Sequence, residues 1–247
     1  MCIRDRIKLL RGTPPQQPLR QIAGFTVIDQ FDSNERFREV LGEDTTGKRM
    51  VLRIYRMPWD ASESEQLKIQ KRATWEAGVL RSFSRAPEDV CLPIVEAPVS
   101  LDDGNIVVPM EHFDGQSLPT WLEKNGEGLD LSARVELWVR IARALAWTHR
   151  SGVVHRQLRP ECVLLSGTHP RLEYRLTGFE LAKRQGHSTT IVWSKAQREA
   201  LEGAAPEVVQ ALSDATPASD QFSLGLLLAY LVLRCPLVES TLPVSYT

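Results

Sequence analysis

The chain has 247 residues, of which 43% are hydrophobic and 25% are charged, and its formal net charge is −1. This length is enough for one or two domains with a sizeable core, and the near-neutral charge argues against a nucleic-acid binder. The four cysteines lack the spacing of a zinc site or of a disulfide framework. The longest apolar run, Phe222–Leu233, is too short to span a membrane, and the charged N-terminus does not resemble a signal peptide. We therefore expect a cytoplasmic protein that binds neither nucleic acid nor membranes.

The two ends of the chain are expected to be adapter scars rather than natural sequence. Residues 1–6 read MCIRDR and residues 243–247 read PVSYT, and one DNA tag read in opposite directions can encode both. The tag resembles a transposon end used to prepare sequencing libraries, and such segments are excluded from fold reasoning. They also predict that the chain is a fragment of a longer protein. Residues 7–23, with a run rich in Pro and Gln, are expected to form a linker.

The next part of the chain predicts short strands and one helix. Two runs of strand-forming residues, Phe37–Leu41 and Arg49–Tyr55, flank a polar turn cluster with a glycine, which predicts a hairpin. Residues Ser62–Phe83 contain few helix breakers and predict a helix. Further short strands are predicted at Ile94–Pro98 and Ile106–Met110.

The second half of the chain predicts mainly helices. Residues Leu131–Arg150 are expected to form one, with Ser132 as its N-cap and Gly152 just beyond its end. A second, more apolar helix is expected from Asp220 to Leu233. The helical period predicts that the first helix buries Val135, Trp138, Ile141, Ala142 and Leu145.

Four motifs occur in an order that resembles the protein kinase family. They are VHRQLRPECVLL at Val154–Leu165, LTGFELAK at Leu176–Lys183, APE at Ala205–Glu207 and SDQFSLG at Ser219–Gly225. In kinases the corresponding motifs are the H-R-D-L-K-P-E-N catalytic loop, D-F-G, A-P-E and a D-x-W-S-L-G helix. The resemblance covers about residues 25–238. It implies an α+β, two-lobed fold, with a strand-rich N-lobe at 24–110 and a helical C-lobe at 111–242 that is truncated after its central helix.

The resemblance places altered residues where kinases carry their catalytic groups. Gln157 replaces the catalytic base, and a side-chain amide cannot accept a proton near neutral pH. Cys162 and Gly178 replace the two Mg²⁺ ligands, although Mg²⁺ prefers hard oxygen ligands. Arg159 replaces the lysine of the catalytic loop. No catalytic position is therefore expected to be intact, and no metal site is predicted.

The nucleotide site is altered less uniformly. Ser33, Glu35 and Arg38 stand where the resemblance places the three glycines that let a loop approach the phosphates. Arg53 replaces the phosphate-pairing lysine and is expected to pair with Glu76.

The adenine pocket keeps its apolar character. By resemblance, Val40, Val51 and Leu164 would sandwich the adenine, and Met110 would be the gatekeeper. The backbone groups of residues Glu111–Phe113 would form the hinge that contacts the adenine. Val51 replaces a usual alanine, so ATP binding is expected to be weak or absent.

Other positions match the family in architectural roles. These positions are His155, Arg156, Phe179, Glu207 and Asp220. The combined pattern predicts a catalytically inactive pseudokinase that serves as a regulatory or binding module for another protein or a fused domain. Two alternatives stay open. One is an atypical kinase or nucleotidyl transferase using Arg53, Arg159 and Glu180, and the other is a purely structural domain.

Overall fold

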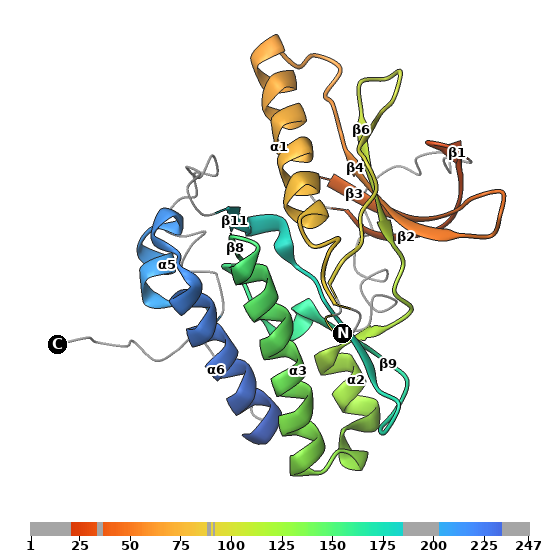
Figure 1. Ribbon diagram of the computed structural model, residues 1–247. Helices are drawn as coiled ribbons and strands as arrows, with labels where there is room; N and C mark the ends of the chain where they lie inside the picture. Colours follow the sequence, from red (N-terminus) through yellow and green to blue (C-terminus); the bar gives the residue numbers. More distant parts are fainter. Residues whose placement is uncertain (1–20, 34–36, 88–89, 91, 185–202, 234–247) are drawn as a thin grey trace, which may run out of the picture. The chain divides into compact units, whose positions relative to one another are not determined.

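The structure is a computed structural model that describes residues 21–33, 37–87, 90, 92–184 and 203–233 (Figure 1). The chain forms two compact units, residues 1–84 with 93–114 and residues 85–92 with 115–247, which we call unit 1 and unit 2. Both segments expected to be adapter scars lie outside the described residues, whereas residues 21–23 of the expected linker are described. Among the helices of the described residues, none has both the length and the apolar character needed to cross a membrane.

Unit 1 is built on a six-stranded sheet in the order β1-β2-β3-β4-β6-β5, and every neighbouring pair is antiparallel. The helix α1 packs against this sheet. The bounds are β1 Gln21–Ile22, β2 Phe25–Ser33, β3 Phe37–Glu43, β4 Arg49–Tyr55, β5 Val99–Ser100, β6 Ile106–Glu111 and α1 Glu63–Arg81.

The predicted hairpin is confirmed as β3 and β4. Asp44 organises its turn, because its Oδ1 accepts the backbone N–H groups of Thr46 and Lys48 at 2.8 and 2.9 Å. Gly47 takes the left-handed conformation of the turn at φ +84°. The predicted strand at 94–98 is wrong: only Val95 makes an isolated bridge, and β5 begins at Val99. Prolines at both ends of that segment lack the N–H that a ladder needs.

The two faces of the sheet bury different sets of side chains. One face packs Ile22, Val40, Met50, Leu52, Ile54 and Val107. The other face packs Phe37, Tyr55, Ile106 and Val108 with Ala73 and Ala77 of α1. The strand period of two therefore decides which residues of β3 and β4 share a face with α1.

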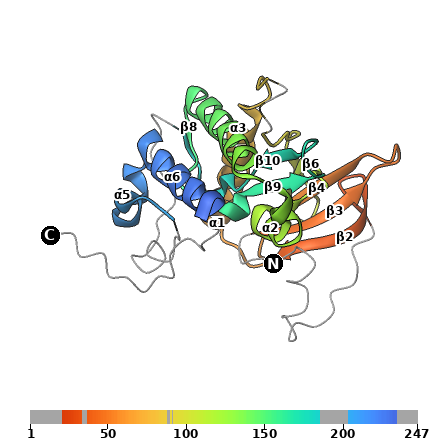
Figure 2. The same cartoon turned by 90° about the horizontal axis from the view of Figure 1, so that it is seen from below.

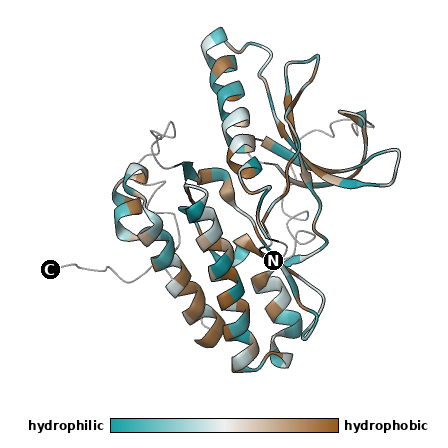
Figure 3. Cartoon of the chain, viewed as in Figure 1, coloured by the Kyte–Doolittle hydropathy of each residue, from teal (hydrophilic) through white to brown (hydrophobic). Residues whose placement is uncertain are grey.

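Unit 2 is mainly helical, and α3 and α6 pack side by side (Figures 1 and 2). Figure 3 shows apolar residues along much of α6. The described residues of unit 2 form the helices α2 Leu118–Asn125, α3 Leu131–Arg150, α5 Pro206–Gln210 and α6 Pro217–Leu233. The strands are β7 Gln116–Ser117, β8 Val153–Val154, β9 Val163–Ser166, β10 Glu173–Leu176 and β11 Lys183–Arg184. Single 3₁₀ turns are η2 Gly126–Gly128, η3 Pro160–Cys162, η4 Phe179–Leu181 and η5 Leu212–Asp214.

The bounds predicted for α3 are confirmed, but its predicted N-cap and buried face are partly wrong. Asp130 is the N-cap, and its carboxylate accepts the Ala133 N–H at 2.8 Å. Val135 is 39% exposed, whereas Arg134 beside it is buried. The Arg134 guanidinium donates to the carbonyls of Leu129, Gly126 and Leu231. These hydrogen bonds satisfy the guanidinium, so Arg134 can be buried although it is charged. A prediction from the positions of apolar residues could not identify it as buried.

Candidate functional site

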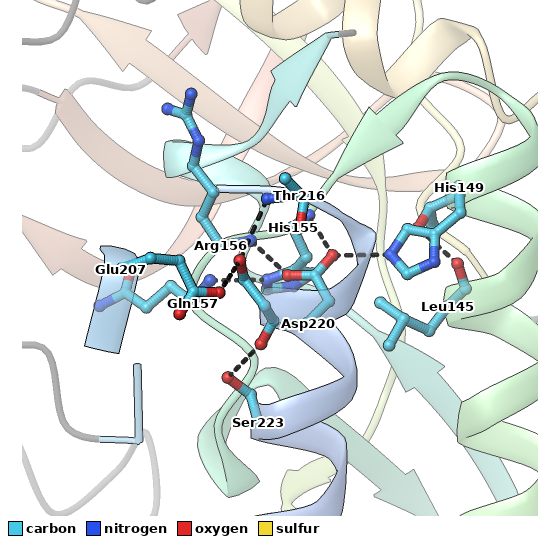
Figure 4. Close-up of polar contacts among 11 residues, drawn as sticks. Leu145, His149, His155, Arg156, Gln157, Glu207, Thr216, Asp220 and Ser223 are labelled. Atoms are coloured by element: carbon cyan, nitrogen blue, oxygen red, sulfur yellow. Dashed lines mark hydrogen bonds and ion pairs between the residues drawn. The ribbon is translucent and has the colours of Figure 1, made fainter. Parts of the chain in front are cut away.

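Asp220 of α6 anchors the loop that follows β8 (Figure 4). Its fully buried carboxylate accepts the backbone N–H groups of His155 and Arg156, both at 2.7 Å. The same carboxylate lies 2.8 Å from His149 Nε2 on α3. Arg156 has a left-handed backbone with φ +70°, which is strained for a residue with a side chain. The two hydrogen bonds that these N–H groups donate to Asp220 hold the loop in this conformation.

His155 connects this loop to the segment before η4. Its Nε2 lies 2.8 Å from the Thr177 carbonyl, and its Nδ1 lies 3.3 Å from the Gln157 N–H. This pattern assigns the neutral tautomer in which Nε2 carries the proton. Burial lowers the pKa of His155, which agrees with a neutral ring. The ring also packs on Phe179, with centroids 4.6 Å apart.

The positions that resemble the metal-binding residues of kinases lie close together. Cys162 is buried, and its Sγ donates to the Gln157 carbonyl at 3.2 Å. A Cβ placed on Gly178 would lie only 2.5 Å from Cys162 Sγ, and Gly178 has φ +86°. The thiol therefore occupies the space into which a side chain at position 178 would extend.

This set of side chains does not fit Mg²⁺. The two positions that hold Mg²⁺ in kinases offer a thiol, Cys162, and no side chain at all, Gly178, where Mg²⁺ requires oxygen ligands. Burial raises the pKa of Cys162 to about 12, so the thiol keeps its proton at neutral pH. Among the described residues, no group of three or more His, Cys, Asp or Glu side chains is arranged to hold a metal ion.

Other expected residues of unit 2 take separate positions. Arg159 is half-buried, and among the described residues its Nε has no hydrogen-bond partner. Leu164 is half-buried in β9 and pairs with Arg175 of β10. Glu207 accepts a hydrogen bond from Ser219 Oγ at 2.5 Å, which ties α5 to α6.

Arg156 is an internal cation of unit 2. Burial lowers its pKa to about 10, which still leaves it charged at neutral pH. One guanidinium nitrogen donates to the Leu181 carbonyl at 3.2 Å. Arg156 therefore links the loop after β8 to η4.

In unit 1, Arg53 lies in a cluster of ionic and aromatic contacts. Its guanidinium contacts the Glu39 carboxylate of β3 at 2.7 Å and also contacts Glu76 of α1. The Tyr55 hydroxyl donates to Glu76 as well. The guanidinium carbon lies 4.2 Å from the centre of the Phe37 ring. Arg53 is thus held by two carboxylates and covered by an aromatic ring.

Val40 and Arg53 lie on opposite faces of the sheet. Val40 pairs with Leu52 and is buried on the opposite face of the sheet. Leu41 pairs with Val51 instead, and Glu39 pairs directly with Arg53. Residue-by-residue matching to the family missed both Glu39 and Leu41. The alternation of residues along β3 was the signal that could have identified them.

The remaining expected pocket residues of unit 1 lie on β6 and after it. Met110 is half-buried and pairs with Val51 of β4. Glu111 is exposed, and its N–H donates to the Ile94 carbonyl at 2.8 Å. Phe113 is half-buried.

Two of the three expected glycine-loop positions are described. Ser33 ends β2, and Arg38 is buried in β3. Burial and the neighbouring Arg56 lower the pKa of Arg38. Glu35 lies outside the described residues.

Comparisons with known proteins agree with the order of elements and motifs. The family described as "Protein kinase domain" matches residues 43–243. The chain is 34% identical over 124 residues to the LRR receptor-like serine/threonine-protein kinase FEI 2 of Arabidopsis thaliana, covering 47% of this chain and 20% of that protein. It is 34% identical over 125 residues to the serine/threonine-protein kinase PknK of Mycobacterium tuberculosis, covering 51% of this chain and 11% of that protein.

The fold resembles solved kinase structures. The PknI kinase domain of Mycobacterium tuberculosis superposes with a TM-score of 0.60 at 19% identity, covering 92% of this chain and 82% of that one. The chain thus spans about a fifth or less of the two curated relatives but most of a kinase domain. Both the family match and the two-part α+β architecture lead to one conclusion: this chain belongs to the protein kinase family.

Proposed function

We propose that this kinase-like domain transfers no phosphate and acts as a regulatory or binding module for another protein or a fused domain. The observation that carries the proposal is the position of the Cys162 thiol beside Gly178. The Cys162 thiol fills the space beside Gly178, where the family places oxygen ligands for Mg²⁺. A buried, protonated thiol is a poor ligand for that ion.

The physical demands of phosphoryl transfer support the proposal. The protein must neutralise charge on the phosphates, mainly through Mg²⁺ and cationic groups, and it must orient the attacking hydroxyl. Gln157 cannot accept the proton of that hydroxyl near neutral pH. The base and both metal ligands are altered together, so a single compensating residue would not restore the chemistry.

A phosphotransfer assay tests the proposal. The purified chain is incubated with radiolabelled ATP, Mg²⁺ or Mn²⁺ and a general acceptor protein, beside the variant Arg53→Ala. We expect no incorporation above that of the variant, because any signal common to both comes from a contaminant. Metal-dependent incorporation that is lost in Arg53→Ala would overturn the proposal in favour of an atypical enzyme.

Thermal unfolding with ATP separates the binding alternatives. At a concentration 100-fold above the Kd, a ligand stabilises the folded state by about 2.7 kcal/mol. We expect any ATP-dependent shift in Tm to be the same with and without Mg²⁺. A shift that requires Mg²⁺ would contradict the proposed loss of the metal site. The absence of any shift at millimolar ATP would favour a purely structural domain.

A further inference from the structure

One side of α3 in unit 2 carries apolar residues that are not covered. We call Leu131, Val135, Ala142 and Ala146 the α3 stripe. Because an α-helix has 3.6 residues per turn, these four positions fall within about 60° of one another around the helix axis. Leu131 is 59% exposed and Val135 is 39% exposed, and Ala146 is exposed as well. A contiguous apolar stripe on a helix surface indicates a site of contact with another protein.

The contacts between α3 and α6 fix the direction in which the α3 stripe faces. The indole Nε1 of Trp138 donates to the Leu224 carbonyl at 2.9 Å. Near the other end of the helix, His149 Nε2 lies 2.8 Å from the carboxylate of Asp220. These contacts hold α3 beside α6 (Figure 1) and prevent it from turning about its own axis. The α3 stripe is therefore a preformed surface.

The side chains of the α3 stripe are large at its N-terminal end and small at its C-terminal end. Leu131 and Val135 form the large end, and Ala142 and Ala146 form the small end. A second copy of α3 in antiparallel orientation sets the large end of each helix against the small end of the other. Leu131 then meets Ala146 of the second copy, four residues beyond the level of the next pair. At that level, Val135 meets Ala142 of the second copy. Such alternation of large and small side chains lets two helices pack closely.

Two charged side chains agree with the same antiparallel arrangement. Glu136 and Arg143 are both exposed and lie along one edge of the α3 stripe. Their midpoint lies one residue, or about 1.5 Å along the axis, from the midpoint of the two apolar pairs. In the antiparallel arrangement, Glu136 of each copy therefore faces Arg143 of the other. A two-fold axis forms this ion pair twice.

We propose that two copies of this chain associate through antiparallel α3 helices related by a two-fold axis. The partner is a second copy because the surface is complementary to itself both in side-chain size and in charge, as a closed two-fold interface requires. The inference goes beyond the proposed function, since it assigns self-association to unit 2 and does not depend on whether the chain transfers phosphate.

Sedimentation equilibrium tests the proposal with the wild-type chain, Glu136→Arg and Arg143→Glu. We expect the wild type to be in a monomer–dimer equilibrium at loading concentrations between about 5 and 200 µM, as suits an interface of modest size. Each variant should dissociate at least about tenfold more readily, because like charges face each other twice. An equimolar mixture of the two variants should regain the wild-type affinity as a heterodimer, since opposite charges then meet at both positions. The double variant Glu136→Arg/Arg143→Glu should regain it alone.

Helix α2 supplies matched controls for both charge reversals. Glu123→Arg and Lys124→Glu change the net charge by the same amounts at exposed positions of the same unit, and they should keep the wild-type affinity. A wild type that is monomeric at every concentration would overturn the proposal and leave the α3 stripe to a different partner. Equal weakening by the α2 variants would overturn it as well, because net charge would then be the cause. Failure of the mixture to associate would refute the antiparallel pairing, whereas its recovery would also show that both variants are folded.

Discussion

At the scale of single residues, Gly178 combines two constraints that can be measured separately. Its backbone has φ +86°, and a Cβ would lie 2.5 Å from Cys162 Sγ. Gly47 has nearly the same backbone, φ +84°, with no atom within 4 Å of a Cβ. We expect Gly47→Ala to lower the free energy of unfolding by about 1–2 kcal/mol from backbone strain. Gly178→Ala should cost about 1–3 kcal/mol more, because the crowded thiol must move. Urea unfolding measures both.

A double-mutant cycle shows whether the thiol causes the difference. In a Cys162→Ala background, the cost of Gly178→Ala should fall toward that of Gly47→Ala, since the crowding sulfur is gone. The same cost in both backgrounds would mean that the thiol does not fill this space. The cycle therefore tests directly the geometry on which the proposed loss of the metal site depends.

At the scale of elements, α3 shows how an N-cap is chosen among neighbouring polar residues. Asp130 accepts the Ala133 N–H, whereas Ser132 lies inside the first turn of the helix and is exposed. We expect Asp130→Ala to lower the free energy of unfolding by about 1 kcal/mol, because it leaves a helix N–H without its acceptor. Ser132→Ala should change it by less than about 0.5 kcal/mol. The reverse order in urea unfolding would restore Ser132 as the cap.

The same helix shows what local sequence can and cannot predict. Its bounds followed from a helical period and a terminal glycine, which are local signals. Its buried face did not follow, because Arg134 turns inward to bond carbonyls as distant in sequence as Leu231. In β3, likewise, the strand was predictable, but the face shared with Arg53 depends on the register with β4. The buried face of α3 and the face of β3 that meets Arg53 are therefore both determined by residues distant in the sequence.

At the scale of the whole molecule, family motifs predicted more than composition did. The kinase-like order of motifs implied the α+β fold and brought attention to Gln157, Cys162 and Gly178, which lie together in unit 2. It did not indicate Glu39, because that residue contacts Arg53 through a cross-strand pair rather than through a motif. Departures from a family pattern are visible in sequence, whereas compensating contacts require coordinates.

The stability of the whole molecule should depend on pH through His155. Burial lowers its pKa below the ordinary value of 6.5, and its Nδ1 accepts the Gln157 N–H. Below pH 6.5 the unfolded chain therefore binds a proton that the folded chain does not, so the free energy of unfolding falls as the pH falls. The slope can approach about 1.4 kcal/mol per pH unit for one such group. Above pH 7 this contribution should be constant.

Unfolding by urea between pH 7.5 and 5 tests this dependence in three proteins: the wild type, His155→Gln and His169→Gln. His155→Gln keeps a donor for the Thr177 carbonyl but does not titrate, so its free energy of unfolding should be lower at pH 7.5 and nearly flat in this range. The exposed His169 provides the matched control, which should keep the wild-type slope.

Asp44 and Glu65 have lowered pKa values, from hydrogen bonds to Thr46 and Ser62 respectively. Their contribution is lost only as the pH falls below their ordinary values near 4, outside the measured range. A slope that survives in His155→Gln would therefore assign the acid sensitivity to a group other than this buried imidazole.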